Sequence, residues 1–250
     1  MPSKSSLFPG FPKQMPSFFR QLVKNNDRDW FAANKAKFEQ HVRDPMLDLV
    51  TRLNDDLRSF AVDHCVDNPS RALYRIYRDT RFSKDKTPYK DHIAATFHRS
   101  QLPRNGAAGL YFSANHKSVE IAGGVYLSDP ADFAILRAAI AARPKQFLQL
   151  IQDKKLTKIM GPILGDQLRH LSKGYEHHAG TPIEPYLRHK QLYWSVQLPA
   201  SLALTPQLHR EILTRFRVMM PALNWMNRAL LAARAAAADR DRPVRPEPMF

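Results

Sequence analysis

The residues best suited to chemistry gather in the segment from Arg75 to Lys90. Its sixteen positions hold six basic residues, two acids and two tyrosines. Guanidinium groups present N–H donors in a fork that fits phosphate and carboxylate oxygens. We therefore predict that the segment binds a phosphate- or carboxylate-bearing small molecule, with turnover left open. The predicted ligand-binding residues are Arg75, Arg78, Asp79, Arg81, Asp85, Lys86 and Tyr89.

Two interpretations of this segment are open. In the first, Asp79 orients the guanidiniums, and Lys86 and Tyr89 complete a pocket from a following loop. In the second, the charges form a ladder of ion pairs on an exposed sheet face. Exposed ion pairs contribute only roughly 0 to 1 kcal/mol, so such a ladder stabilises a fold weakly and does not require arginine. This argument favours the binding site.

The geometry of the site depends on the path of the chain. Aromatic and β-branched residues favour a strand over residues 72–82. In a strand, alternate side chains point to opposite faces, which places Arg75 and Arg81 on one face and Arg78 on the other. A single pocket therefore requires the chain to turn near Arg78.

The same segment resembles a known protein family, domain-of-unknown-function family 2461. That family is marked by Arg-x-x-Arg-Asp-x-Arg-Phe, followed shortly by Asp-Lys-x-x-Tyr. The matching residues are Arg75, Arg78, Asp79, Arg81, Phe82, Asp85, Lys86 and Tyr89. Further similarities are Asn25-Asn26, Trp30-Phe31, Asn34-Lys35, Gly123-Gly124 and Lys173-Gly174-Tyr175. The resemblance covers residues 15–225 and implies membership, but no catalytic role.

The charge of the chain suggests anionic partners. Its 38 Lys and Arg residues and 23 Asp and Glu residues give a net charge of +15. Residues 1–14 carry +2 and residues 234–250 carry +1, which leaves +12 on residues 15–233. A positive field raises the encounter rate with anions. A nucleic-acid-binding module is therefore the alternative function, and a protein-interaction scaffold is a further one. The oligomeric state is left open.

Other catalytic and cofactor signatures are weak. Ten histidines include the pair His177-His178, but no metal-binding spacing accompanies them. Cys65 follows a histidine, and Ser83-x-x-Lys86 matches a short acyl-enzyme pattern, although neither is specific. Gly-rich nucleotide-binding motifs are missing from the sequence. We predict no metal and no cofactor, and whether the protein is an enzyme stays open.

Localisation follows from what the sequence lacks. A single cysteine, Cys65, excludes an intramolecular disulfide framework. Residues 1–10 lack the apolar stretch of a signal peptide. The longest helix-like apolar stretch, residues 133–142, is far shorter than the roughly 20 residues that span a bilayer. We expect a cytoplasmic protein without a membrane segment.

The hydrophobic pattern predicts an α+β fold: N-terminal helices, a central antiparallel sheet, then helices including a long C-terminal helix. Three helices are expected before about residue 62. Predicted strands cover residues 72–82, 93–98, 110–114, 118–126 and 191–198. Gly123-Gly124 inside a strand indicates a bulge or a close backbone approach. The predicted C-terminal helix covers residues 206–234.

The domain organisation predicted from these patterns is simple. Residues 1–14 form an extended lead that can dock Phe8 or Phe11 on the domain. Residues 15–233 form a single α+β domain, and residues 234–250 form a disordered tail rich in arginine and alanine.

Overall fold

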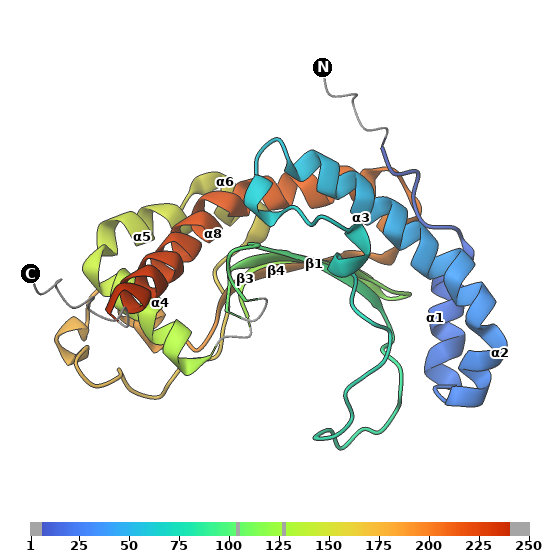
Figure 1. The fold of residues 1–250 in the computed structure, drawn as a ribbon, viewed down its shortest axis with the longest axis horizontal. Coiled ribbons are helices and arrows are strands. Elements are labelled where there is room, and N and C mark those ends of the chain that lie inside the picture. The colour runs from blue at the N-terminus through green and yellow to red at the C-terminus, as the bar shows by residue number, and fades with distance from the viewer. Residues whose placement is uncertain (1–6, 104–105, 127–128, 241–250) are drawn as a thin grey trace, which may run out of the picture.

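A computed structural model describes residues 7–103, 106–126 and 129–240 of the chain. It shows the expected α+β fold, with helices packed against a four-stranded antiparallel sheet (Figure 1). The helices before the sheet are α1 (Gln14–Lys24), α2 (Arg28–Phe38) and α3 (Asp44–Leu57). Those after its third strand are α4 (Pro130–Ala142), α5 (Pro144–Ile151), α6 (Lys154–Met160), α7 (Glu184–Arg188) and α8 (Gln207–Arg240).

The N-terminal helices form as the apolar spacing predicts. The side chain of Asp27 caps α2 by accepting a hydrogen bond from the Trp30 N–H, 2.8 Å away. A π-helical segment, Glu39–Arg43, joins α2 to α3 without a break. Phe8 and Phe11 of the lead are both buried, so residues 7–13 pack on the domain.

Four of the five predicted strands are confirmed. They are β1 (Ile93–His98), β2 (Gly109–Ala114), β3 (Ser118–Val125) and β4 (Leu192–Pro199), paired in that order. The strand predicted over residues 72–82 is wrong. In this stretch only Leu73 and Tyr77 form isolated bridges. After Tyr77, residues 78–81 are all polar, so a strand there would have no apolar face to bury.

One face of the sheet is apolar and packs against α8. Phe97, Leu110 and Gly123 lie in one row across this face. Phe216 of α8 lies edge-on to Phe97, with ring centroids 6.2 Å apart. A Cβ at Gly123 would lie 2.9 Å from the sulfur of Met219, so glycine allows the close approach of α8. The pairing runs regularly through Gly123, which excludes the bulge.

The C-terminal helix extends further than the hydrophobic pattern predicts. Helix α8 runs through Pro221 and continues to Arg240, six residues beyond the predicted end at Arg234. The added residues are mostly alanine, the strongest helix former. Residues 241–250 of the predicted tail lie outside the described residues. None of the helices described is long and apolar enough to cross a membrane.

Candidate functional site

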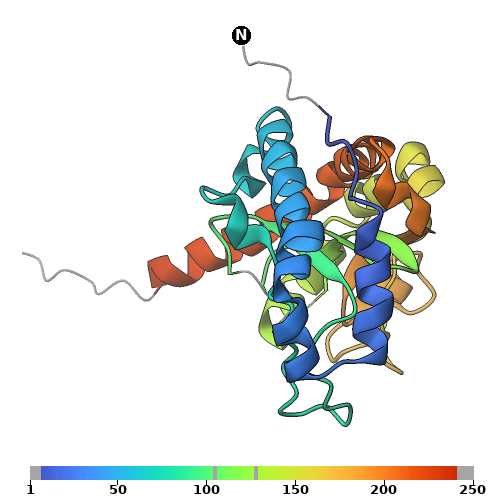
Figure 2. The same cartoon turned by 90° about the vertical axis from the view of Figure 1, so that its right-hand side faces the viewer.

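Residues 73–92, here called the motif loop, connect a 3₁₀ turn (Pro69–Ala72) to β1 and extend away from the sheet (Figures 1 and 2). A short ladder of hydrogen bonds closes the base of the loop. The Lys90 N–H donates to the Ile76 carbonyl at 2.8 Å, and the Arg78 N–H donates to the Pro88 carbonyl at 2.9 Å. Residues 79–87 then reverse the chain, so it turns directly after Arg78.

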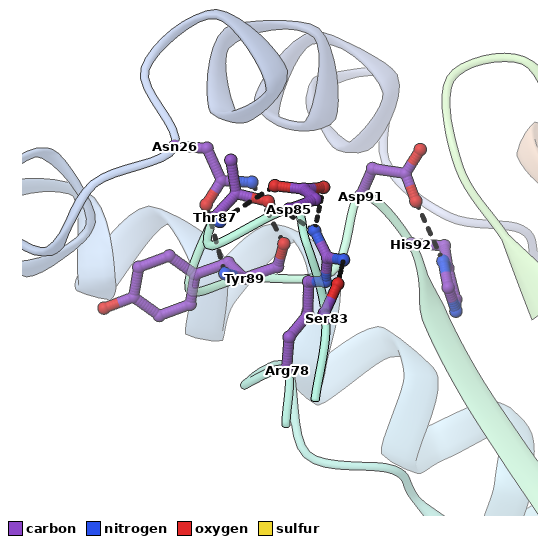
Figure 3. Close-up of polar contacts among 8 residues, drawn as sticks. All are labelled: Asn26, Arg78, Ser83, Asp85, Thr87, Tyr89, Asp91 and His92. Carbon is purple, nitrogen blue, oxygen red and sulfur yellow. Dashed lines mark hydrogen bonds and ion pairs between the residues drawn. The ribbon is translucent and has the colours of Figure 1, made fainter. Parts of the chain in front are cut away.

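The base of the loop is anchored on the N-terminal helices. Tyr89 is buried and stacks on Phe31 of α2, with ring centroids 4.1 Å apart. The side-chain amide of Asn26 accepts a hydrogen bond from the Tyr89 N–H at 3.1 Å and donates to the Tyr89 carbonyl at 3.0 Å (Figure 3). Asn26 therefore pairs with the backbone of Tyr89 as a neighbouring strand would.

Arg78 lies at the centre of the loop and is half-buried. Its guanidinium donates hydrogen bonds to Asp85 and Thr87, and a longer one of 3.5 Å to Ser83 (Figure 3). The bond from Arg78 lowers the pKa of Asp85 from 3.8 to about 2. Arg78 thus holds the two arms of the loop together.

The charged side chains at the tip of the motif loop are exposed. Arg81 pairs with Asp79 at 2.7 Å, and both side chains are exposed. Lys86 donates to the Thr80 carbonyl at 2.9 Å. Phe82 at the tip is 94% exposed, far more than any other large apolar side chain described.

The structure therefore gives the seven predicted residues different surroundings. Tyr89 is covered by Phe31, and Arg78 is directed toward Asp85. Arg75 is exposed, and its guanidinium forms no ion pair within the described ranges. A small anion bound by all three arginines would have to compete with Asp79 and Asp85. The binding role of these residues stays a prediction.

A cavity of about 580 Å³ opens on the sheet face opposite α8. This volume lies within the range of small-molecule sites. We call it the sheet-face cavity, and none of the seven predicted residues lines it. Its lining residues are Tyr74, Thr96, His98, Ala107, Gly109, Tyr111, Glu120, Ala122, Gly123, Gly124, Tyr126, Leu164, Tyr193, Ser195 and Gln197.

Small residues form the floor of the sheet-face cavity. Gly109, Gly124 and Ala122 lie on the two central strands, in the rows that also contain Tyr111 and Tyr193. Gly124 has φ +136°, and a Cβ there would lie 2.3 Å from the Leu192 carbonyl oxygen. A larger residue cannot replace it without moving β4.

Tyrosines form the walls of the cavity in two edge-to-face pairs. Tyr74 and Tyr111 have ring centroids 6.1 Å apart and planes at 63°. Tyr126 and Tyr193 are 5.0 Å apart with planes at 86°. Burial raises the pKa of Tyr111 to about 12, further above neutral pH than its ordinary value of 10.0. Its phenol is protonated at neutral pH with or without this shift, and it can donate a hydrogen bond.

A carboxylate lies within this cavity. Glu120 of β3 accepts a hydrogen bond of 2.6 Å from the Ser195 hydroxyl of β4. Its cross-strand neighbours are Ser113 and Gln197, which carry no charge. Glu120 forms no ion pair among the residues that the structure describes.

Sequence reasoning missed this cavity, although a signal for it existed. Thr96, Tyr111, Glu120 and Ser195 occupy alternate positions of four different strands, on the side opposite the apolar residues. An antiparallel sheet with one apolar face exposes the other, and polar residues there normally meet water. The pattern indicated a polar face, but the concavity of that face depends on the segments around it.

Neither Cys65 nor the histidines form a catalytic or metal-binding arrangement within the described residues. Cys65 lies 3.5 Å from the Asn54 carbonyl oxygen, and burial raises the pKa of its thiol, which opposes activation as a nucleophile. Its neighbour His64 contacts the Ala108 carbonyl instead. Across the described ranges, no group of three or more His, Cys, Asp or Glu side chains is arranged to hold a metal ion.

Comparison with protein families confirms the family expected from the sequence. Residues 14–225 match the model of a family described as conserved hypothetical protein (DUF2461). The chain belongs to this family. The match includes the motif loop, the whole sheet and α8 as far as Trp225. Neither a curated protein nor a solved structure matches the chain significantly.

Proposed function

We propose that the protein binds a small organic molecule in the sheet-face cavity. The observation that carries this proposal is a tyrosine-walled cavity of about 580 Å³ whose floor consists of glycine and alanine. Aromatic walls supply apolar contact, while Glu120 and Ser195 supply hydrogen-bonding groups that orient a ligand. The floor residues keep the space open because side chains larger than methyl are missing there.

Thermal unfolding with a panel of amines, sugars, nucleosides and carboxylic acids tests this function. A ligand at one hundred times its Kd stabilises the folded state by about 2.7 kcal/mol. For a chain of this size, that corresponds to a rise in Tm of about 5–10 °C. Ala122→Trp fills the cavity floor and should abolish the shift.

A matched pair of tyrosines controls for general destabilisation. Tyr126 and Tyr77 are 57% and 59% exposed, but only Tyr126 lines the cavity. Tyr126→Ala should reduce the ligand-dependent shift, whereas Tyr77→Ala should leave it unchanged. If no compound raises the Tm of the native protein more than it raises the Tm of Ala122→Trp, the sheet-face cavity is not a binding site.

The motif loop supports a second candidate function, binding of single-stranded nucleic acid. Phe82 is 94% exposed, and the guanidinium of Arg81 lies 5.8 Å from its ring centroid. Lys84 and Lys86 follow on the same exposed tip. An aromatic ring beside cations offers a stacking platform for a base together with contacts for phosphates.

Fluorescence anisotropy with a labelled oligothymidylate tests the second candidate. Loss of one stacked base costs roughly 1–3 kcal/mol, so Phe82→Ala should weaken binding about tenfold or more. Phe82→Tyr should retain binding because the ring remains. Val62→Ala is the control, since Val62 is another exposed apolar residue outside the loop. Binding that is absent near physiological salt, or unchanged in Phe82→Ala, argues against this function.

A further inference from the structure

The charge of the sheet-face cavity differs from that of the chain. The chain carries 38 lysines and arginines, yet none of those within residues 7–103, 106–126 and 129–240 lines the cavity. Among the described lining residues, Glu120 is the only carboxylate. A bound anion would therefore face Glu120 without a lining cation to compensate it. This contrast favours a ligand that is neutral or positively charged.

The carboxylate of Glu120 can accept more hydrogen bonds than the described residues supply to it. A carboxylate accepts about four hydrogen bonds. The Ser195 hydroxyl supplies one at 2.6 Å, and its cross-strand neighbours, Ser113 and Gln197, supply no positive charge. A half-buried carboxylate is stabilised when a cation pairs with it, because part of its hydration is lost. A ligand ammonium group would provide that charge.

The tyrosine walls suit a cation as well. Aromatic faces carry negative electrostatic potential and attract cations within about 6 Å of the ring centroid. The edge-to-face geometry of Tyr126 and Tyr193 directs the edge of one ring at the face of the other, so the two rings do not cover each other as a parallel stack would. Tyr74 already receives a cation, since the Lys90 ammonium lies 5.1 Å from its centroid.

From these observations, and on the basis of the proposed binding function, we infer that the ligand of the sheet-face cavity is an organic cation. Its ammonium or alkylammonium group lies beside Glu120, and its carbon substituents lie against the faces of Tyr111, Tyr126 and Tyr193. The positive body opposes the approach of such a ligand at long range. At 0.15 M salt, however, charges more than about 8 Å apart are largely screened, whereas the contact with Glu120 is not.

Isothermal titration at 0.15 M salt with choline and its neutral carbon analogue tests the inference. In the analogue, a tert-butyl group replaces the trimethylammonium group, so shape is kept and charge is removed. Choline should bind about tenfold or more tightly than the analogue. Glu120→Gln should remove most of that preference. Glu39→Gln, which changes a partly exposed glutamate on the π-helical segment, should not.

Two substitutions of Tyr193 give a second test, which asks whether the aromatic ring itself contributes to binding the cation. Tyr193→Phe keeps the aromatic face and should retain choline binding, whereas Tyr193→Leu should weaken it about tenfold. Equal binding of choline and the analogue would overturn the inference. If neutral compounds bind and Ala122→Trp blocks them, the proposed function stands while the cationic ligand fails. If Ala122→Trp blocks no compound, both fail.

Discussion

The motif loop and the sheet-face cavity share one residue, Tyr74, but they are built in opposite ways. The loop is positively charged, and its central arginine is occupied by partners within the loop. The cavity is lined by tyrosines and one glutamate whose carboxylate lacks a cation among the described residues. In the loop, the charged groups hold the chain together. In the cavity, the carboxylate of Glu120 faces open space.

If the sheet-face cavity binds a ligand as proposed, the recognisable motif does not mark the binding site. The chain belongs to the family, and Arg78, the central residue of the predicted motif, braces the loop through Asp85 and Thr87. The cavity residues come from all four strands and from the segments around them, so no single short motif contains the whole set. A structural role for the motif and a binding role for the sheet are compatible. Four predictions test that division.

The largest expected effect is at the floor of the cavity. Gly124→Ala places a Cβ 2.3 Å from the Leu192 carbonyl at φ +136°, which should destabilise the fold by about 3 kcal/mol or more. Gly180→Ala is the control, because Gly180 also has positive φ but has no atom within 4 Å of the added Cβ. It should cost about 1 kcal/mol. Equal losses in urea unfolding would show that the floor is not tightly constrained.

The next effect concerns the anchor of the motif loop. Asn26→Ala removes both hydrogen bonds to the backbone of Tyr89 and should cost about 2 kcal/mol, because these groups are partly buried. Asn25→Ala removes one exposed bond to the Gln21 carbonyl and should change the free energy of unfolding by less than about 0.5 kcal/mol. If Asn25→Ala is the more damaging, Asn26 is not the anchor.

A smaller effect distinguishes the two paired arginines of the loop. Arg78→Ala should speed hydrogen exchange at the Thr87 amide about fivefold, which corresponds to about 1 kcal/mol, since Arg78 is half-buried. Arg81→Ala removes an exposed ion pair with Asp79 and should change exchange less than twofold. If Arg81→Ala speeds exchange at the Thr87 amide more than Arg78→Ala does, Arg78 does not brace the loop, and a binding role is favoured.

The smallest effect is a titration within the loop. The pKa of Asp85 lies at about 2, below its ordinary 3.8, because Arg78 donates a hydrogen bond to the carboxylate. Because the folded-state pKa is the lower one, this contribution to stability is complete above 3.8 and disappears as the pH falls through about 2. Carboxyl NMR should place the midpoint near 2 in the native protein and nearer 3.8 in Arg78→Ala. An unchanged midpoint in that variant would contradict the pairing.

The sequence determined the fold class and four of the strands. Local patterns suffice there, because side chains alternate along a strand and the apolar set must be buried. The same reasoning failed for residues 72–82, where strand-forming residues are followed by polar ones on both sides. Only Leu73 and Tyr77 form bridges in that stretch, so tertiary context overrode local preference.

Only the tertiary structure decided what the polar residues do. Arg78 meets Asp85 because the chain reverses between them, and Asn26 meets Tyr89 across sixty-three positions of sequence. Membership of the family, by contrast, could be predicted from residue types alone, and the match over residues 14–225 confirms it. The sheet-face cavity exists because four strands align their small and aromatic residues in register, which depends on long-range pairing that no local pattern records.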